Sequence, residues 1–236
     1  MNFFTDQIPK WISLLFLILI FVPVLLIASR AYKAAPDESR KFNRQAAILI
    51  IIFYAVYFSA VIFASYQGVF SELSLPPTII VYTTFPLLAF YLLIIFNLKT
   101  FKRIVHFVSV EKLIHLHIFR LIGGFFIILY YFDALPKTFG LIAGCGDVTI
   151  ALSSLVVAKY YKNQKKIAKE LAIIWNTLGL IDIIVTSGMA IYYTKLSIVT
   201  GIKGVFILTE IPFCLIPAFA PATIISLHIL IYKKFL

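Results

Sequence analysis

Seven apolar segments, each of about 20 residues or more, constrain the fold of this chain more than any other feature of its sequence. A helix needs about 20 mostly apolar residues to cross the roughly 30 Å hydrocarbon core of a bilayer. We therefore predict membrane spans at residues 11–29, 46–66, 79–97, 116–133, 138–158, 171–193 and 206–232. The sequence thus predicts an all-α integral membrane protein, a bundle of seven transmembrane helices that forms a single domain over residues 1–236.

The composition agrees with this prediction, because 62% of the residues are hydrophobic and only 13% are charged. The formal net charge of +11 does not indicate nucleic-acid binding, because the Lys and Arg residues are dispersed between the apolar segments rather than gathered on one solvated face. We expect the lipid bilayer as a partner and no nucleic acid. The sequence leaves the oligomeric state open.

The basic residues lie mostly in alternate connections. Sixteen of them follow the first, third, fifth and seventh predicted spans, whereas four lie in the remaining segments outside the membrane. Since Lys and Arg near the ends of spans are retained on the cytoplasmic side, this bias predicts an external N-terminus and a cytoplasmic C-terminus.

Residues 98–115 have an amphipathic pattern, with apolar residues on one helical face and Lys102 and Arg103 on the opposite face. This pattern predicts an interfacial helix on the cytoplasmic side. The alternative is that the fourth span begins earlier than residue 116.

Ionisable residues inside spans cost about 2.5 to 3.5 kcal/mol each on insertion scales, so each is a functional-site hypothesis. The candidates are Arg120, Asp147, Asp182, Glu210 and His228. Asp147 lies about 14 Å and Asp182 about 16 Å from the start of its predicted span, so both reach the middle of the membrane. Their helices are consecutive and closely connected, which predicts antiparallel neighbours with facing carboxyls.

Asp147 lies on a helical face of small residues, and Asn176 flanks the face of Asp182. We predict that these three side chains form a polar site at the midplane, where two carboxyls at close range share or retain a proton. The alternative is that they only hold the helices together through hydrogen bonds.

Arg120 and His228 lie nearer the inner ends of their predicted spans. We predict that they share a polar surface open to the cytoplasm, and the alternative is that both only reach toward the lipid head groups. Glu210 lies at the outer end of the seventh predicted span, a position that also suits the membrane interface. The candidate substrate or proton-binding residues are therefore Arg120, Asp147, Asn176, Asp182, Glu210 and His228. No residue is assigned a catalytic role.

The sequence contains no H-E-x-x-H, paired C-x-x-C, P-loop or G-x-S-x-G motif, so it predicts neither a cofactor nor a metal site and argues against an enzyme. A midplane carboxyl that is neutral when buried and charged when hydrated favours proton- or ion-coupled transport of a small solute. One alternative is an enzyme or binder that acts on lipid head groups at the inner leaflet through Arg120 and His228. Another is an accessory subunit of a membrane complex.

The second half of the chain carries a series of short motifs. They are R-x-x-G-G from Arg120, a Leu-Pro turn at Pro136, G-x-G-D ending at Asp147, W-N-x-x-G-x-x-D ending at Asp182, and a late histidine, His228. In these motifs the chain resembles a family of uncharacterised bacterial multi-pass inner-membrane proteins. The resemblance implies a location in the bacterial inner (cytoplasmic) membrane and singles out the same polar residues, but it implies no activity.

Overall fold

The computed structural model describes residues 4–34, 40–202 and 204–235, and the regular secondary structure over these ranges is entirely helical. Within them, seven helices or runs of consecutive short helices are long and apolar enough to cross a membrane. The prediction of a helical multi-pass membrane protein is therefore confirmed. Which end of the bundle faces the cytoplasm stays a prediction, as does the identity of the membrane.

The first span consists of α1 (Lys10–Leu19) and α2 (Phe21–Tyr32), and the second is α3 (Arg40–Tyr66). The third consists of the π-helical turn η2 (Ile80–Thr84), α4 (Phe85–Ala89), the π-helical turn η3 (Phe90–Ile94) and the 3₁₀ turn η4 (Ile95–Asn97). Helix α5 (Lys99–Phe107) precedes the fourth span, which comprises α6 (Val110–Leu116), the 3₁₀ segment η5 (His117–Gly123) and α7 (Gly124–Tyr131). The fifth and sixth spans are α8 (Lys137–Lys162) and α9 (Ala168–Thr200), and the 3₁₀ turn η6 (Phe206–Thr209) precedes the seventh span, α10 (Leu215–Phe235).

Residues 98–115 combine both interpretations of their sequence. Helix α5 is a separate amphipathic helix, and the fourth span also begins early, at Val110. The backbone is extended at Ser109, which separates the two helices. Leu113 and Ile114 are buried, so apolar packing draws the segment after Ser109 into the bundle.

The seventh span begins at Leu215, so the predicted start at residue 206 is wrong. Pro212 lies in the turn between η6 and α10. Proline has no amide hydrogen and disfavours helical backbone in the residue before it, so one continuous helix does not run through Pro212.

Pro221 lies inside α10 and cannot donate a hydrogen bond to the carbonyl of Pro217 one turn earlier. The hydroxyl of Thr84 donates to that carbonyl instead, at 2.7 Å. The hydroxyl of Tyr57 donates to the neighbouring carbonyl of Ala218, at 3.0 Å. Side chains of the second and third spans therefore satisfy the backbone around this proline.

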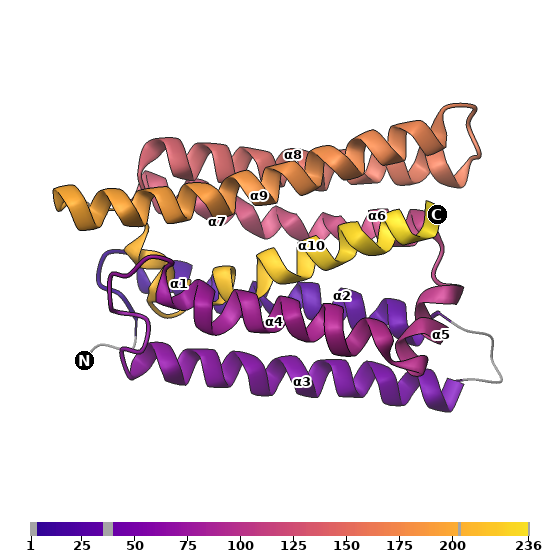
Figure 1. Ribbon diagram of the computed structural model, residues 1–236, viewed down its shortest axis with the longest axis horizontal. Coiled ribbons are helices and arrows are strands. Elements are labelled where there is room, and N and C mark those ends of the chain that lie inside the picture. Colours follow the sequence, from indigo (N-terminus) through magenta and orange to yellow (C-terminus); the bar gives the residue numbers. More distant parts are fainter. Residues whose placement is uncertain (1–3, 35–39, 203, 236) are drawn as a thin grey trace.

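The long helices run side by side along the longest axis of the molecule, and the two chain ends lie at its opposite ends (Figure 1). Helices α8 and α9 pack against each other along one side, and α3 and α4 lie along the other. Helix α10 lies between these two sides and contacts α9, α4, α3 and α6. Because most side chains of α10 are buried, the core of the bundle is centred on this helix.

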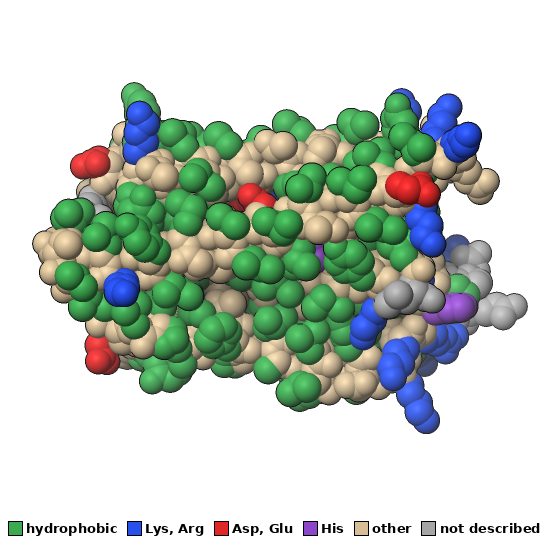
Figure 2. All heavy atoms as spheres, turned by 45° about the horizontal axis from the view of Figure 1, so that its top comes forward, with side chains coloured by type: hydrophobic (Ala, Val, Ile, Leu, Met, Phe, Trp, Pro, Cys, Tyr) green, Lys and Arg blue, Asp and Glu red, His purple; other side chains and the backbone are tan. Residues whose placement is uncertain are grey.

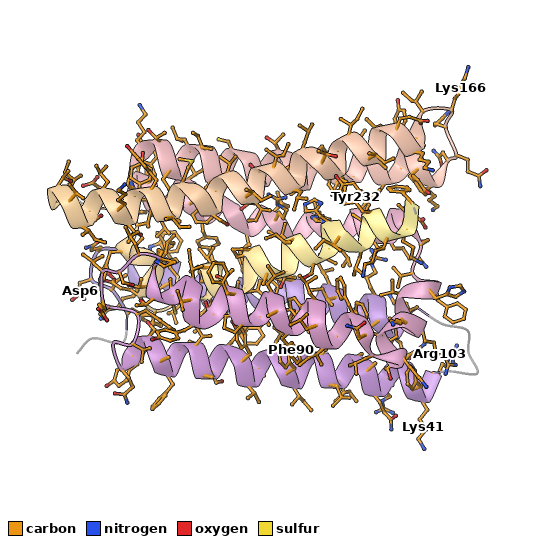
Figure 3. The ribbon with its side chains drawn as sticks, in the orientation of Figure 1. Asp6, Lys41, Phe90, Arg103, Lys166 and Tyr232 are labelled. Atoms are coloured by element: carbon orange, nitrogen blue, oxygen red, sulfur yellow. The ribbon has the colours of Figure 1, made fainter. Side chains whose placement is uncertain are left out.

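Basic side chains gather at one end of the bundle. Figure 3 shows Lys41, Arg103 and Lys166 at the end that holds the C-terminus, and Asp6 at the opposite end. Figure 2 shows most of the visible Lys and Arg side chains at one end of a long apolar surface. We call the end with Lys41, Arg103 and Lys166 the basic end. It has the charge expected of a cytoplasmic face and agrees with the predicted orientation.

Candidate functional site

The side chain of Arg120 lies between the two aspartates of the fifth and sixth spans, and it is fully buried. Its Nε donates a hydrogen bond to Oδ1 of Asp147 at 2.7 Å, and its Nη2 donates to Oδ2 of Asp182. Its Nη1 donates to the backbone carbonyl of Gly179 at 3.1 Å. The guanidinium therefore uses three of its nitrogens to join the fourth, fifth and sixth spans.

The local winding of the fourth span explains where Arg120 points. Segment η5 is a 3₁₀ helix, in which residues three apart lie above one another. His117, Arg120 and Gly123 follow this spacing, and all three are buried. They form one ridge that faces the fifth, sixth and seventh spans.

Three glycines allow the helices to approach each other closely at this point. A Cβ atom on Gly123 would overlap the carboxyl of Asp147, and one on Gly146 would overlap the carboxyl of Asp182. A Cβ atom on Gly179 would lie 2.6 Å from Cε1 of His228. The close packing around the ion pairs of Arg120 therefore requires glycine at these three positions.

His228 from α10 reaches the same place and is held by Asn176 from α9. The amide nitrogen of Asn176 donates to the backbone carbonyl of His228 at 3.1 Å, which leaves Oδ1 of Asn176 to accept from Nδ1 of His228 at 2.8 Å. In this arrangement Nδ1 carries the proton, and Nε2 is free to accept. Nε2 lies 3.5 Å from Nη1 of Arg120. We call Arg120, Asp147, Asn176, Asp182 and His228 the polar centre.

The structure thus brings together every predicted site residue except Glu210. Glu210 lies between η6 and α10, where it lines a pocket of about 500 Å³ that Asp6 and Gln7 also line. Its backbone carbonyl accepts from the amide of Cys214 at 2.9 Å. Glu210 therefore belongs to the end of the bundle opposite the basic end, apart from the other candidate residues, and its role in binding a substrate or proton stays a prediction.

The predicted polar surface of Arg120 and His228, open to the cytoplasm, is also wrong. Arg120 is 1% exposed and His228 is 0% exposed. The physical reason is the early start of the fourth span, because Arg120 follows Val110 by ten residues, or about 15 Å. The arginine therefore lies near the middle of its span, at the depth of the two aspartates that it binds.

His117 is a further member of this region, and the sequence analysis did not single it out. It is fully buried, and neither of its ring nitrogens has a hydrogen-bond partner among the residues that the structure describes. Its ring centroid lies 4.2 Å from that of His228 and 5.1 Å from that of Trp175. His117 precedes Arg120 by three residues, and this spacing places the two side chains directly above one another only if the segment is a 3₁₀ helix rather than an α-helix.

The polar centre contains one guanidinium and two carboxyls. If both carboxyls are ionised, it holds one negative charge in excess, and an uncompensated charge inside a membrane is costly. One bound proton or one monovalent cation removes that charge. Among the residues that the structure describes, no three His, Cys, Asp or Glu side chains are grouped so as to hold a metal ion. The polar centre is therefore neutral when it holds one proton or one monovalent cation.

No curated protein and no solved structure matches this chain. A family model described as a domain of unknown function (DUF8737) matches residues 76–232. The match includes the third to sixth spans, nearly all of the seventh, and all five residues of the polar centre. The chain therefore belongs to this family of unknown function, DUF8737.

Proposed function

We propose that the protein is a proton- or ion-coupled carrier of a small solute, with Arg120, Asp147 and Asp182 as its coupling site. The observation that carries the proposal is the unequal charge of the polar centre, in which one buried guanidinium binds two carboxyls. A proton makes this group neutral and therefore compatible with the low dielectric of the membrane interior. Loss of the proton makes it an anion that requires water or a cation.

The two charge states favour different conformations. The neutral state is stable in the closed packing of the bundle, whereas the charged state is stable only where water enters the site. A proton that binds or leaves therefore shifts the population between a closed and a hydrated conformation. A carrier needs coupling of this kind, because the protonation of one residue then controls whether water and solute can reach the midplane.

Asp182 is the carboxyl that we assign to proton exchange. Its side chain is 17% exposed, compared with 9% for Asp147. Each carboxyl accepts one hydrogen bond from Arg120, so the greater exposure of Asp182 is the observation that assigns proton exchange to it and leaves Asp147 as the ionised partner of the guanidinium. The alternative of a lipid-head-group enzyme using Arg120 and His228 is not retained, because both side chains are buried at depth.

The test is transport by the purified protein in liposomes that contain a pH-sensitive dye. Pools of amino acids, sugars, carboxylates and inorganic ions are added outside, with and without an imposed pH gradient. We expect at least one pool to drive proton movement in wild-type liposomes. Asp182→Asn should abolish that proton movement while exchange of the same solute continues. Glu210→Gln, which removes an acid outside the polar centre, is the matched control and should behave like wild type.

A second measurement does not depend on the identity of the solute. Infrared difference spectra after a pH jump should show the carbonyl stretch of a protonated carboxyl in the wild type, and this band should be lost in Asp182→Asn. If no pool drives proton movement and the band is unchanged in the variant, the polar centre only joins helices and the proposal is refuted.

A further inference from the structure

A second polar feature lies where α5 meets the end of α10, apart from the polar centre. It is a pocket of about 310 Å³ that we call the basic pocket. Its polar lining consists of Lys102, His106, Lys233 and Lys234, and Phe96 and Phe101 form part of its apolar wall. Figure 1 shows α5 at the end of the bundle that holds the C-terminus, which is the basic end.

The fold builds this pocket by turning the chain sharply after the third span. The backbone becomes extended at Leu98, and α5 then runs away from the direction of the span (Figure 1). The rings of Phe96 and Phe101 stack across the turn with centroids 5.3 Å apart. Nζ of Lys233 lies 4.8 Å from the centroid of Phe96, and Nζ of Lys234 donates to the backbone carbonyl of His106 at 3.0 Å. Two ammonium groups are therefore held at the wall of the pocket.

The charge of the basic pocket is not balanced by its own lining. Its described lining residues include three lysines and no carboxyl. A second pocket at the connection between α8 and α9 is also rich in lysine, but Glu111 and Glu170 line it as well. The lining of that second pocket has four lysines and these two carboxyls, so the excess of positive charge is larger in the basic pocket, and no lining carboxyl competes there with an external anion.

The apolar surroundings indicate what kind of anion this is. Leu93 and Ile94 are more than half exposed in the third span, shortly before Phe96 of the pocket wall. Leu98, which precedes α5, and Phe107, its last residue, are also exposed. An anion that carries acyl chains would place them along these side chains while its charge meets the lysines. A free anion would leave this apolar surface uncovered by the same ligand.

We propose that the basic pocket binds the phosphate group of an anionic phospholipid from the adjacent leaflet. Basic pockets between transmembrane helices on the cytoplasmic side are suited to anionic head groups. The stacked phenylalanines form the pocket wall, and Lys102, Lys233 and Lys234 supply the charge. This binding is independent of proton coupling at the polar centre.

The test is lipid titration of the detergent-purified full chain, followed by native mass spectrometry. Phosphatidylglycerol and phosphatidylcholine with identical acyl chains are compared, and inorganic phosphate is added as a competitor. We expect one tightly held phosphatidylglycerol per chain, weaker phosphatidylcholine binding, and no competition by phosphate at equal ionic strength. The variant Lys102→Gln/Lys233→Gln/Lys234→Gln should bind phosphatidylglycerol at least about tenfold more weakly.

The matched control is Lys162→Gln/Lys165→Gln/Lys166→Gln, which removes the same charge from the other lysine-rich pocket and should stay within about threefold of wild type. Equal loss in both triple variants would show that only general surface charge attracts the lipid. Equal binding of the two lipids, or displacement by inorganic phosphate, would show that the pocket does not select an anionic lipid. Each of these results would overturn the proposal.

Discussion

The charge of the polar centre predicts an unusual pattern among asparagine variants. Asp147→Asn or Asp182→Asn alone leaves one carboxylate beside Arg120, which is a neutral pair that needs no proton. Asparagine also keeps an oxygen that can accept from the guanidinium. We therefore expect each single variant to change the free energy of unfolding by less than about 1 kcal/mol. The double variant leaves the buried guanidinium without a counter-ion, which should cost about 3 to 5 kcal/mol.

The interaction energy is the cost of the double variant minus the costs of the two single variants. It should therefore be at least about 1 kcal/mol, and about 3 kcal/mol for values at the centre of these ranges. Replacing the arginine as well, in Arg120→Met/Asp147→Asn/Asp182→Asn, should recover much of the loss, because no buried charge remains. Unfolding can be followed by the fluorescence of Trp175, whose ring centroid lies 5.9 Å from that of His228. Glu210→Gln serves as the control for removing an acid elsewhere in the chain.

The pH dependence of the same series follows from proton counting. If the folded wild type retains one proton that the unfolded chain releases, its free energy of unfolding falls as pH rises, by up to about 1.4 kcal/mol per pH unit. The single variants hold no such proton and should lose this slope. The reasoning is refuted if each single substitution costs about 3 to 5 kcal/mol and the costs add in the double variant, because both carboxyls would then be ionised and independent.

Three further predictions address packing, the unpaired histidine and orientation. Gly146→Ala should lower the free energy of unfolding by about 1 to 3 kcal/mol, because the added methyl group would overlap the carboxyl of Asp182. Its control is Gly188→Ala, whose methyl group would have no neighbouring atom within 4 Å and should be neutral or stabilising in the same unfolding assay. His117→Phe should raise the free energy of unfolding, because it removes a buried imidazole without hydrogen-bond partners, and a loss of stability in urea or detergent titration would contradict this. A reporter fused after Lys166 should be cytoplasmic and one fused between α7 and α8 external, and the reverse pattern would contradict the predicted orientation.

The depth of the two aspartates could be predicted from sequence because it depends only on counting residues from the ends of long, regular helices. Asp147 and Asp182 lie in α8 and α9, whose α-helical winding is uninterrupted over 26 and 33 residues. A boundary error of a few residues moves such a position by only a few ångströms. The prediction that the two carboxyls lie near each other at mid-span therefore agreed with the structure, although both bind Arg120 rather than each other.

The position of Arg120 could not be predicted in the same way. Its depth depends on where the fourth span begins, and the polar residues around Ser109 leave that start ambiguous in sequence. Its direction depends on a 3₁₀ segment, and nothing in local propensity distinguishes that winding from an α-helix here. Because an arginine near a membrane interface can also extend toward head groups, the interfacial interpretation was the natural one for a residue assigned to the wrong depth.

A buried ion triad is weak evidence for stability, because well-packed apolar side chains of similar volume are often equally stable or more stable. In the polar centre the triad lies beside His228, whose ring packs against that of His117, and the close approach of the helices there requires glycine at three positions. Stability alone does not explain this combination, since each feature removes apolar packing from the middle of the bundle. The proposed coupling accounts for it, because a group that is neutral with one bound proton or cation and charged without it has two states that a membrane can distinguish. The contacts of Arg120 with Asp147, Gly179 and His228 join the four spans that meet there, the fourth to the seventh.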